Sequence, residues 1–359
     1  MKNKVLVGTR KGLLVLEKAD NKWKITGDHF MGIPVNMVFE NEYNGDWWVA
    51  LDHGHWGNKL QRSADHGETW EEIPAPVYPE GTFVKEDVPA SLRYIWAFSP
   101  VTSEDGDQLW IGTEPGGLFK REPDGSMSFV ESLWNHPSRP DHWFGGGRDY
   151  AGIHSIVVDP RDEDHIYLGV SVAGVFESND GGSSWTGKNN GLRAEFLPNP
   201  DAEYGHDPHL LVHCRSSPDV LWQQNHCGIF RSADAGTTWQ DISDKKGQAN
   251  FGFAIAADAE NDQRAWVVPA ISDEVRMAID KRLCVCRTDD GGKSWNTFRN
   301  GLPQEYCFDI VYRHALIAQG SEVFFGTTTG NLFYSSDAGE NWESISNYLP
   351  MVYGLAFAS

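Results

Sequence analysis

Three histidines, His154, His209 and His226, are the side chains of this sequence best suited to chemistry. A neutral imidazole can bind a transition metal, and an imidazole can transfer a proton near neutral pH. Three interpretations are open: a divalent metal held by three nitrogen ligands, acid–base or hydrogen-bonding groups in a polar pocket, or histidines that only fill a wet channel. One histidine alone fits the third interpretation, and the three together favour a pocket. The metal site comes last because no compact ligand spacing supports it.

Carboxylates complete the set of candidate residues. A glycosidase needs two carboxyl groups at a separation that depends on its reaction, and the sequence does not give this separation. The candidates for catalysis, with His209 or Asp207 as the proton-transfer group, are His209, Asp207, Glu114 and Asp149. The candidates for binding a ligand, in which the arginines would orient an anionic group, are Arg10, Arg148, His154 and His226. Any one of the acids could instead form a salt bridge or cap a loop.

A repeated fold must position these side chains, because aspartates recur along the chain at intervals of about 45 to 59 residues. Five lie in a short motif, Ser/Thr-x-Asp-x-Gly-x-Thr/Ser/Asn-Trp, and two mark worn copies. The motif aspartates are Asp65, Asp180, Asp234, Asp290 and Asp337, and the worn copies contain Asp20 and Asp124. A fixed period of this length over the whole chain indicates a repeat architecture.

Each repeat reads as four short strands, because β-branched and aromatic runs alternate with clusters of Gly, Pro, Asp and Asn. Radially arranged four-stranded repeats make a β-propeller. The expected innermost strands are 35–39, 93–98, 154–158, 209–213, 251–256 and 308–312. A strand pattern at 352–357 has no repeat of its own, so we expect it to complete the first blade beside 5–8. The sequence thus predicts an all-β, seven-bladed β-propeller that forms one domain over residues 1–359.

The motif falls where the third strand of a repeat turns into the fourth. An aspartate there can accept backbone N–H bonds and hold the turn, and the tryptophan can pack between neighbouring sheets. Seven turns spread around a ring cannot converge on one substrate. We therefore interpret these aspartates as architectural.

Function is expected on the opposite face of the ring, where the long insertions fall. Strand direction alternates within a blade, so loops leading into first strands share a face with loops that join second and third strands. The insertions on this face are 74–91, 131–150, 186–208 and 269–282. Long loops gathered on one side of a rigid scaffold usually carry binding.

The composition of the chain limits the classes of partner that it can bind. The net charge of −21 argues against nonspecific binding to nucleic acid and to anionic membranes, and no stretch is apolar enough to cross a membrane. The five cysteines are odd in number and irregularly spaced, which does not suggest a disulfide framework. We expect a cytoplasmic protein with a small polar or carbohydrate ligand, and its oligomeric state stays open.

The motif set resembles the Asp-box, or bacterial neuraminidase repeat. Patterns at 8–13 (Gly-Thr-Arg-Lys-Gly-Leu) and 225–232 (Asn-His-Cys-Gly-Ile-Phe-Arg-Ser) are similar to those of Asp-box propellers described as glycosyl hydrolases or exo-sialidase-like proteins. The resemblance implies a propeller and a sugar-directed hydrolase. Sialidases, however, have six blades, an arginine triad and an Arg-Ile-Pro signature. Here Gly32 precedes Ile33 and Pro34 and no arginine trio is expected at matching positions, so we do not predict true sialidase activity.

The alternative function is a non-catalytic scaffold or assembly factor that holds a protein on the same face. Photosystem assembly factors and sortilin-type receptors carry the same box without catalysis, and xyloglucan-directed glycosidases carry it on two propellers. A deep polar pocket ringed by histidines and acids would favour the hydrolase. A flat apolar face containing Trp134 and Trp143 would favour the scaffold.

Overall fold

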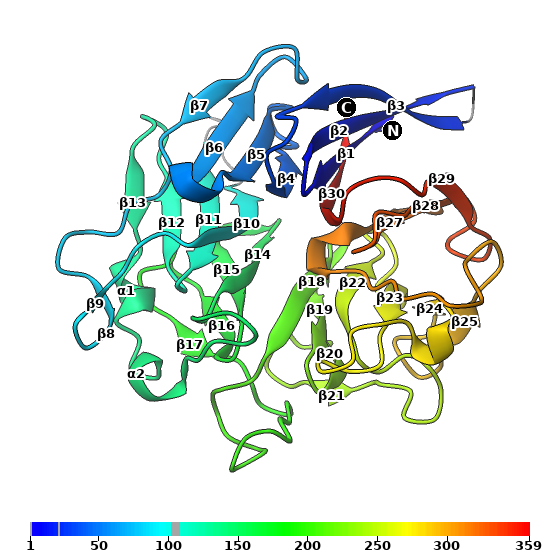
Figure 1. The fold of residues 1–359 in the computed structure, drawn as a ribbon. Helices are drawn as coiled ribbons and strands as arrows, with labels where there is room; N and C mark the ends of the chain where they lie inside the picture. The colour runs from blue at the N-terminus through cyan, green and yellow to red at the C-terminus, as the bar shows by residue number, and fades with distance from the viewer. Residues whose placement is uncertain (1, 21, 102–107) are drawn as a thin grey trace.

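Seven four-stranded antiparallel sheets surround a central axis (Figure 1). The computed structural model describes residues 2–20, 22–101 and 108–359. The predicted all-β, seven-bladed β-propeller is confirmed, and the helices in the described part of the chain are few and short. None of these helices has the length and apolar character needed to span a membrane.

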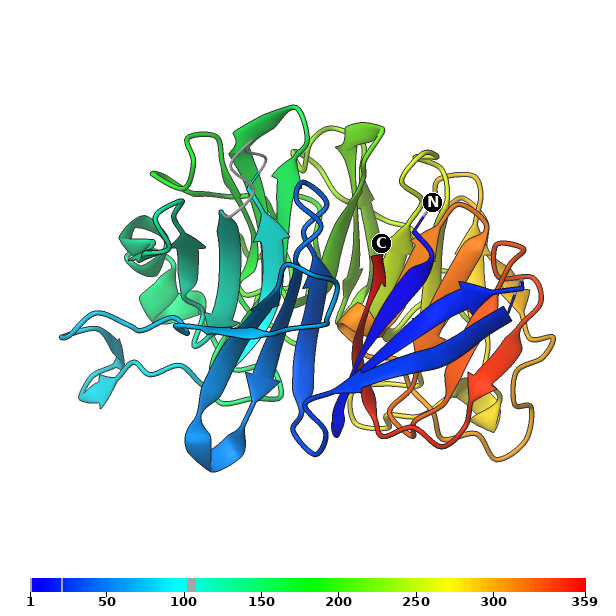
Figure 2. The same cartoon turned by 90° about the horizontal axis from the view of Figure 1, so that it is seen from above.

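The first blade joins the first and last described strands. Its order is β3-β2-β1-β30, formed by β1 (Lys4–Thr9), β2 (Gly12–Ala19), β3 (Lys22–His29) and β30 (Val352–Ala358). β30 runs antiparallel to β1, with Lys4 opposite Ala358 and Val7 opposite Leu355 (Figure 2). The predicted closure is confirmed, and this pairing covers the strand edge that β1 would otherwise expose.

Each of the other six blades uses four consecutive strands from the axis outward. The second blade holds β4 (Val35–Glu40), β5 (Trp47–Asp52), β6 (Asn58–Ser63) and β7 (Glu71–Ile73). The third holds β10 (Tyr94–Pro100), β11 (Leu109–Glu114), β12 (Leu118–Arg121) and β13 (Met127–Phe129). The fourth holds β14 (Ile153–Asp159), β15 (Asp162–Val170), β16 (Gly174–Ser178) and β17 (Thr186–Gly187).

The remaining three blades repeat this arrangement. The fifth holds β18 (Pro208–Cys214), β19 (Ser217–Asn225), β20 (Gly228–Ser232) and β21 (Gln240–Asp241). The sixth holds β22 (Gly252–Ala257), β23 (Ala265–Pro269), β24 (Val285–Thr288) and β25 (Asn296–Phe298). The seventh holds β26 (Leu316–Gln319), β27 (Glu322–Gly326), β28 (Leu332–Ser335) and β29 (Glu343–Ser346).

The innermost strand of the seventh blade corrects the sequence-based prediction. The alternating pattern at 308–312 predicts this strand, but the strand is β26, and the 3₁₀ helix η3 (Arg313–Ala315) leads into it. Residues 308–312 form an extended loop instead. The carboxylate of Asp309 accepts hydrogen bonds from Thr329 and Asn331, and Ile310 is buried near Phe253. These contacts take the place of the strand pairing that the pattern suggests.

The five motif turns share one hydrogen-bond pattern. In the last of them, Asp337 Oδ1 accepts the Ser335 hydroxyl at 2.7 Å and the Asn341 backbone N–H at 2.9 Å. The Ser335 hydroxyl oxygen accepts the N–H of Gly339 at 2.9 Å. Equivalent bonds occur at Asp65, Asp180, Asp234 and Asp290. The aspartates of the motif therefore stabilise turns, and the candidate catalytic residues are found elsewhere in the fold.

The hydrophobic core lies between neighbouring blades. The indole N–H of Trp239 donates to the carbonyl of Lys188 at 2.8 Å, and that of Trp295 donates to Ile242 at 2.8 Å. Each of these carbonyls belongs to the preceding blade. The inner strands also approach closely, because a Cβ atom at Gly112 would lie 2.8 Å from the carbonyl oxygen of Ile153. Blade-to-blade packing thus fixes where the inner strands begin, and with them the side chains at the axis.

Short elements interrupt the connections between strands. The hairpin of β8 (Phe83–Lys85) and β9 (Val88–Pro89) lies at the periphery (Figures 1 and 2). Two short helices, α1 (Glu131–Trp134) and α2 (Arg139–His142), precede β14. The 3₁₀ helices η1 (Gly54–Trp56) and η2 (Ile279–Lys281) lie in connections between second and third strands.

Candidate functional site

A pocket of about 540 Å³ opens at the axis on the face away from the motif turns. Its lining comes from the loops that lead into innermost strands, the starts of those strands, the ends of second strands and the connections between second and third strands. In an antiparallel sheet these positions lie at the same end. The charged and histidine side chains of the lining are Glu114, Arg148, His154, Asp207, His209, His226, Asp273, Arg276, Arg313 and His314.

Six of the eight expected site residues meet in this pocket, and two do not. Glu114, Arg148, His154, Asp207, His209 and His226 all line it. Arg10 and Asp149 are exposed and are not part of the lining. Arg10 follows β1 at the rim, where its charge acts on Tyr353, and Asp149 follows Arg148 in a loop that directs the arginine rather than the aspartate inward.

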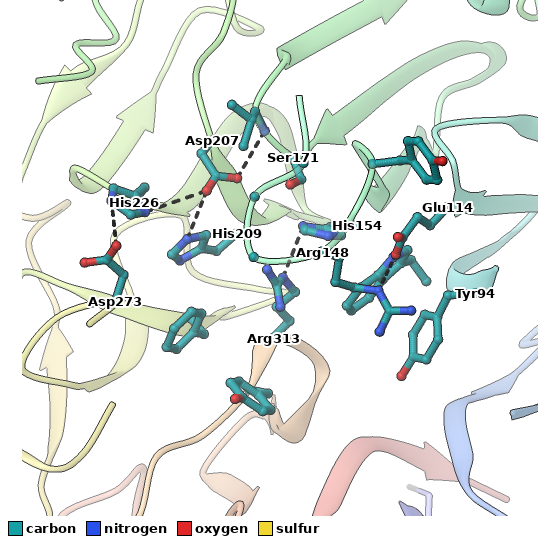
Figure 3. Close-up of a pocket in the computed structure, with 18 of the residues that line it drawn as sticks. Tyr94, Glu114, Arg148, His154, Ser171, Asp207, His209, His226, Asp273 and Arg313 are labelled. Atoms are coloured by element: carbon teal, nitrogen blue, oxygen red, sulfur yellow. Dashed lines mark hydrogen bonds and ion pairs between the residues drawn. The ribbon is translucent and has the colours of Figure 1, made fainter. Parts of the chain in front are cut away.

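Asp207 is buried between two histidines (Figure 3). Its Oδ2 atom lies 3.5 Å from Nε2 of His209 and 3.7 Å from Nδ1 of His226. Its Oδ1 atom accepts the backbone N–H of Val172 at 3.2 Å. Burial alone would raise the pKa of Asp207, but the neighbouring His209 and the charge of Arg313 hold it below its ordinary value. Asp207 is therefore an ionised carboxylate at neutral pH.

His209 has a fixed orientation in this cluster. It is the second residue of β18, it is 2% exposed, and its ring stacks on Phe253 with centroids 4.8 Å apart. Its Nδ1 atom lies 2.7 Å from the carbonyl oxygen of Gly252. A carbonyl only accepts hydrogen bonds, so Nδ1 carries a proton and Nε2 is directed at Asp207.

Glu114 ends β11 and forms a second polar group in the pocket. Arg148 Nε donates to Glu114 Oε2, and the indole N–H of Trp96 donates to the same oxygen at 3.4 Å. Burial raises the pKa of Glu114, although Arg148 and Trp96 oppose this shift. Glu114 thus keeps its proton to higher pH than an ordinary glutamate, whereas Asp207 loses its proton at lower pH than an ordinary aspartate.

His154 belongs to a third group, together with an arginine from the seventh blade. Arg313 Nε donates to His154 Nδ1 at 3.1 Å. Burial, and then the charge of Arg313, lower the pKa of His154 well below its ordinary value. Burial also lowers the pKa of Arg313 to about 10, which leaves it charged at neutral pH. His154 is therefore a neutral hydrogen-bond acceptor toward Arg313.

The expected trio of metal-binding histidines is replaced by a different group. Among the described residues, the side chains whose ligand atoms lie within 4.8 Å of one another are Asp207, His209 and His226. His154 is not part of this group, and its Nδ1 atom instead accepts a hydrogen bond from Arg313. The sequence places His154 and His209 at matching strand starts, but it does not show which partner each ring faces.

Sequence reasoning missed several residues of the pocket. Arg313 and His314 were overlooked because the innermost strand of the seventh blade was placed too early. With β26 in its true position, both residues precede an innermost strand, as Asp207 precedes β18. Asp273 lies 3.8 Å from His226 Nε2. Arg276, from the insertion expected on this face, also lines the pocket between β23 and β24. Arg148, Arg276 and Arg313 thus line the pocket together, although they do not hold matching positions in their blades.

The apolar face that would favour a protein scaffold is not formed by the two tryptophans proposed for it. Trp134 is 8% exposed, and Trp143 is partly buried beside Phe176. The guanidinium carbon of Arg139 lies 3.5 Å from the ring centre of Trp134 and 4.8 Å from that of Trp143. Both tryptophans therefore pack inside the loop that leads into the fourth blade.

Comparisons with known proteins agree with a propeller. A family model described as Sortilin-Vps10 (sortilin, neurotensin receptor 3) matches residues 227–353, a segment that contains the last three motif turns. An oligoxyloglucan-reducing end-specific xyloglucanase of Emericella nidulans is 23% identical over 344 residues, which is 91% of this chain and 36% of that protein. The xyloglucanase Xgh74A of Acetivibrio thermocellus is 21% identical over 275 residues, 66% of this chain and 29% of its own length. The chain thus spans about a third of these curated relatives.

Solved structures share the fold at low sequence identity. The structure of an ancestral GH74 enzyme has a TM-score of 0.58 at 18% identity, and the match covers 86% of this chain and 38% of that one. The structure of YCF48 from Cyanidioschyzon merolae has a TM-score of 0.55 at 14% identity, and the match covers 94% of this chain and 90% of that one. Similarity at this level shows the propeller fold alone, so the function has to be argued from the site.

Proposed function

We propose that this chain is a glycosidase-like hydrolase that binds a small carbohydrate in the axial pocket. The observation that carries the proposal is the pair of buried carboxyl groups, Glu114 and Asp207, whose pKa values shift in opposite directions. Opposite shifts are how one site supplies both a proton donor and a charged base at the same pH. The curated relatives with xyloglucanase activity, one of which aligns over 91% of this chain, support this reaction class.

The two carboxyl groups take different roles. Glu114 holds its proton to higher pH than an ordinary glutamate and would donate it to the oxygen of the leaving group. Asp207 is ionised and, together with His209, would take a proton from the attacking water. Arg148 contacts Glu114 and would orient that carboxyl group.

The lining suits a sugar. It holds three carboxyl groups and three arginines, so its net charge is small, which favours a polar ligand without a large net charge. Trp96, which is only partly buried, supplies an aromatic face against which a sugar ring can pack. The volume lies in the usual range for small-molecule pockets, roughly 300–1,000 Å³, so a single small saccharide or a chain end fits this site.

Turnover of aryl glycosides and oligosaccharides tests the proposal. The wild type should release sugar from at least one member of the panel. Glu114→Gln and Asp207→Asn should each lower kcat by about 10²–10⁴-fold, because each removes a proton-transfer group. Asp149→Asn is the matched control, since it makes the same kind of change at an exposed carboxylate outside the lining. A wild type that hydrolyses nothing, or two variants as active as the control, would refute the proposal.

A further inference from the structure

We propose that Asp207, His209 and His226 bind a divalent transition-metal ion of the Zn²⁺ type. The three residues come from the loop before β18, from β18 itself and from the connection between β19 and β20, so the fifth blade supplies all of them. The ligand set stands whether or not the pocket is catalytic. In the proposed hydrolase the bound ion would hold and acidify the attacking water, in place of direct proton transfer to Asp207 and His209, and only this role rests on the proposed function.

The distances suit a single ion. Asp207 Oδ2 lies 3.5 Å from His209 Nε2 and 3.7 Å from His226 Nδ1, and all three ligand atoms lie within 4.8 Å of one another. Bonds of about 2.0–2.1 Å in a tetrahedral zinc site place ligand atoms about 3.3 Å apart. Small side-chain rotations are enough to close the site around an ion.

The hydrogen bonds around the three residues have the pattern found around metal ligands. A ligating histidine usually donates a hydrogen bond from its second ring nitrogen to a carbonyl or a carboxylate, which fixes the orientation of the ring. The Nδ1–H group of His209 donates to the carbonyl oxygen of Gly252 at 2.7 Å. His226 directs Nε2 at Asp273 Oδ2, 3.8 Å away (Figure 3). The free oxygen of Asp207 accepts the backbone N–H of Val172 at 3.2 Å.

The remaining nitrogen of His209 is the atom that a metal ion would bind. Since Nδ1 donates to the carbonyl oxygen of Gly252, Nε2 is the nitrogen that faces the carboxylate of Asp207. A buried carboxylate needs a positive partner, which a proton on Nε2 or a metal ion between the two atoms would supply. His209 and Asp207 are 2% and 5% exposed, so bulk water does not screen this contact.

The chemistry of the donor atoms selects the class of ion. Two imidazole nitrogens and one carboxylate suit Zn²⁺, Fe²⁺ or Mn²⁺, whereas Ca²⁺ and Mg²⁺ prefer sites made of oxygen atoms. The side chain of His226 is 26% exposed and lies at the pocket. Three protein ligands leave a coordination position open toward that pocket, the arrangement of a catalytic rather than a structural zinc site.

Metal titration of the full chain tests the site without any activity assay. Protein treated with a chelator is titrated with Zn²⁺ by calorimetry, and Co²⁺ absorption reports coordination by imidazole. Wild type should bind one equivalent of Zn²⁺ and bind Mg²⁺ at least 100-fold more weakly. His226→Ala should lose at least 100-fold in affinity. Asp273→Asn, which removes only the outer partner, should lose about 10-fold.

His154→Gln is the matched control, because it changes a histidine of the same pocket outside the proposed ligand set. It should keep the affinity of wild type. His226 and Asp273 are partly exposed, so their variants should fold as wild type does. Circular dichroism checks the fold of each variant. Wild type that binds none of Zn²⁺, Co²⁺ or Mn²⁺ stoichiometrically, or His226→Ala that binds as wild type does, overturns the proposal. A metal-binding chain that hydrolyses no glycoside would retain this site and reject only the proposed function.

Discussion

Arg313 donates a hydrogen bond from Nε to Nδ1 of His154 across 3.1 Å, although 159 residues separate them in the sequence. The contact joins the seventh blade to the fourth across the axis of the ring (Figure 3). It also sets the state of the histidine, since Nδ1 must be free of a proton to accept this bond. The arginine therefore separates His154 from the neighbouring cluster of Asp207.

This contact predicts the protonation of His154. Burial and Arg313 both lower its pKa, so nitrogen NMR should show a neutral ring protonated on Nε2 at pH 6.5. Arg313→Gln removes one of the causes and should raise this pKa toward the ordinary value, while burial still keeps it lower. A charged His154 ring in the wild type at pH 6.5 would contradict the account.

The fold was largely predictable, because it depends on a local pattern that recurs. Each motif turn is held by its own serine or threonine and aspartate, so short stretches of sequence were enough to locate the blades. The seventh blade was the exception. Its alternating segment at 308–312 is held by Asp309 and Ile310 in a loop, through contacts with distant residues that no local pattern reveals.

The site was predictable only in outline. Positions at strand starts indicated that His154 and His209 lie near the axis, but which atoms meet depends on side-chain rotation and on loops. Asp207 rather than His154 lies beside the other two histidines, and His154 instead accepts a hydrogen bond from Arg313. Arg10 and Asp149 were expected from their places in loops, and their exposed side chains are absent from the lining.

Loss of a motif aspartate should destabilise the fold. Burial opposes the shift, but hydrogen bonds from Asn341 and Ser335 hold the pKa of Asp337 below its ordinary value. Asp337→Ala should lower the free energy of unfolding by about 1–2 kcal/mol at pH 7. Because a lowered carboxyl pKa stabilises the fold only while the group is ionised, the difference between variant and wild type should shrink as the pH falls below about 3.8.

Urea unfolding at pH 7 and at pH 3 measures this effect. Asp124→Ala is the control, because among the described residues Ser126 is the one that donates a hydrogen bond to the Asp124 carboxylate, and it should cost less stability. Equal losses in the two variants, or a loss for Asp337→Ala that grows toward low pH, would contradict the structural role of the motif.

Closure of the ring depends on the apolar residues of β30. Leu355 is 5% exposed and lies opposite Val7 in the first blade. Leu355→Ala should cost about 2–5 kcal/mol, the usual loss for a leucine truncated in a core. Tyr348→Ala changes a side chain that is 94% exposed, close to β30, and should stay within about 0.5 kcal/mol of wild type. Thermal unfolding of both variants checks the closure, and similar stabilities would argue against it.

The pH dependence of turnover should report Glu114. Its raised pKa keeps the proton donor in its acid form above the ordinary value of 4.5, and activity should fall as the pH rises through the pKa of Glu114. Arg148→Gln removes a positive charge that lowers this pKa, so the alkaline limb of the kcat profile should move to higher pH. A limb that stays in place or moves to lower pH would show that another group donates the proton.

The most direct test of the central claim compares wild type with the double variant Glu114→Gln/Asp207→Asn in the release of reducing sugar from a panel of small oligosaccharides. Both substitutions keep the size of the side chain, so the pocket should retain its shape. The proposed function predicts turnover by the wild type and none above background by the double variant. Turnover that survives in the double variant, or its absence in the wild type, would contradict the assignment of this pocket as a hydrolase site.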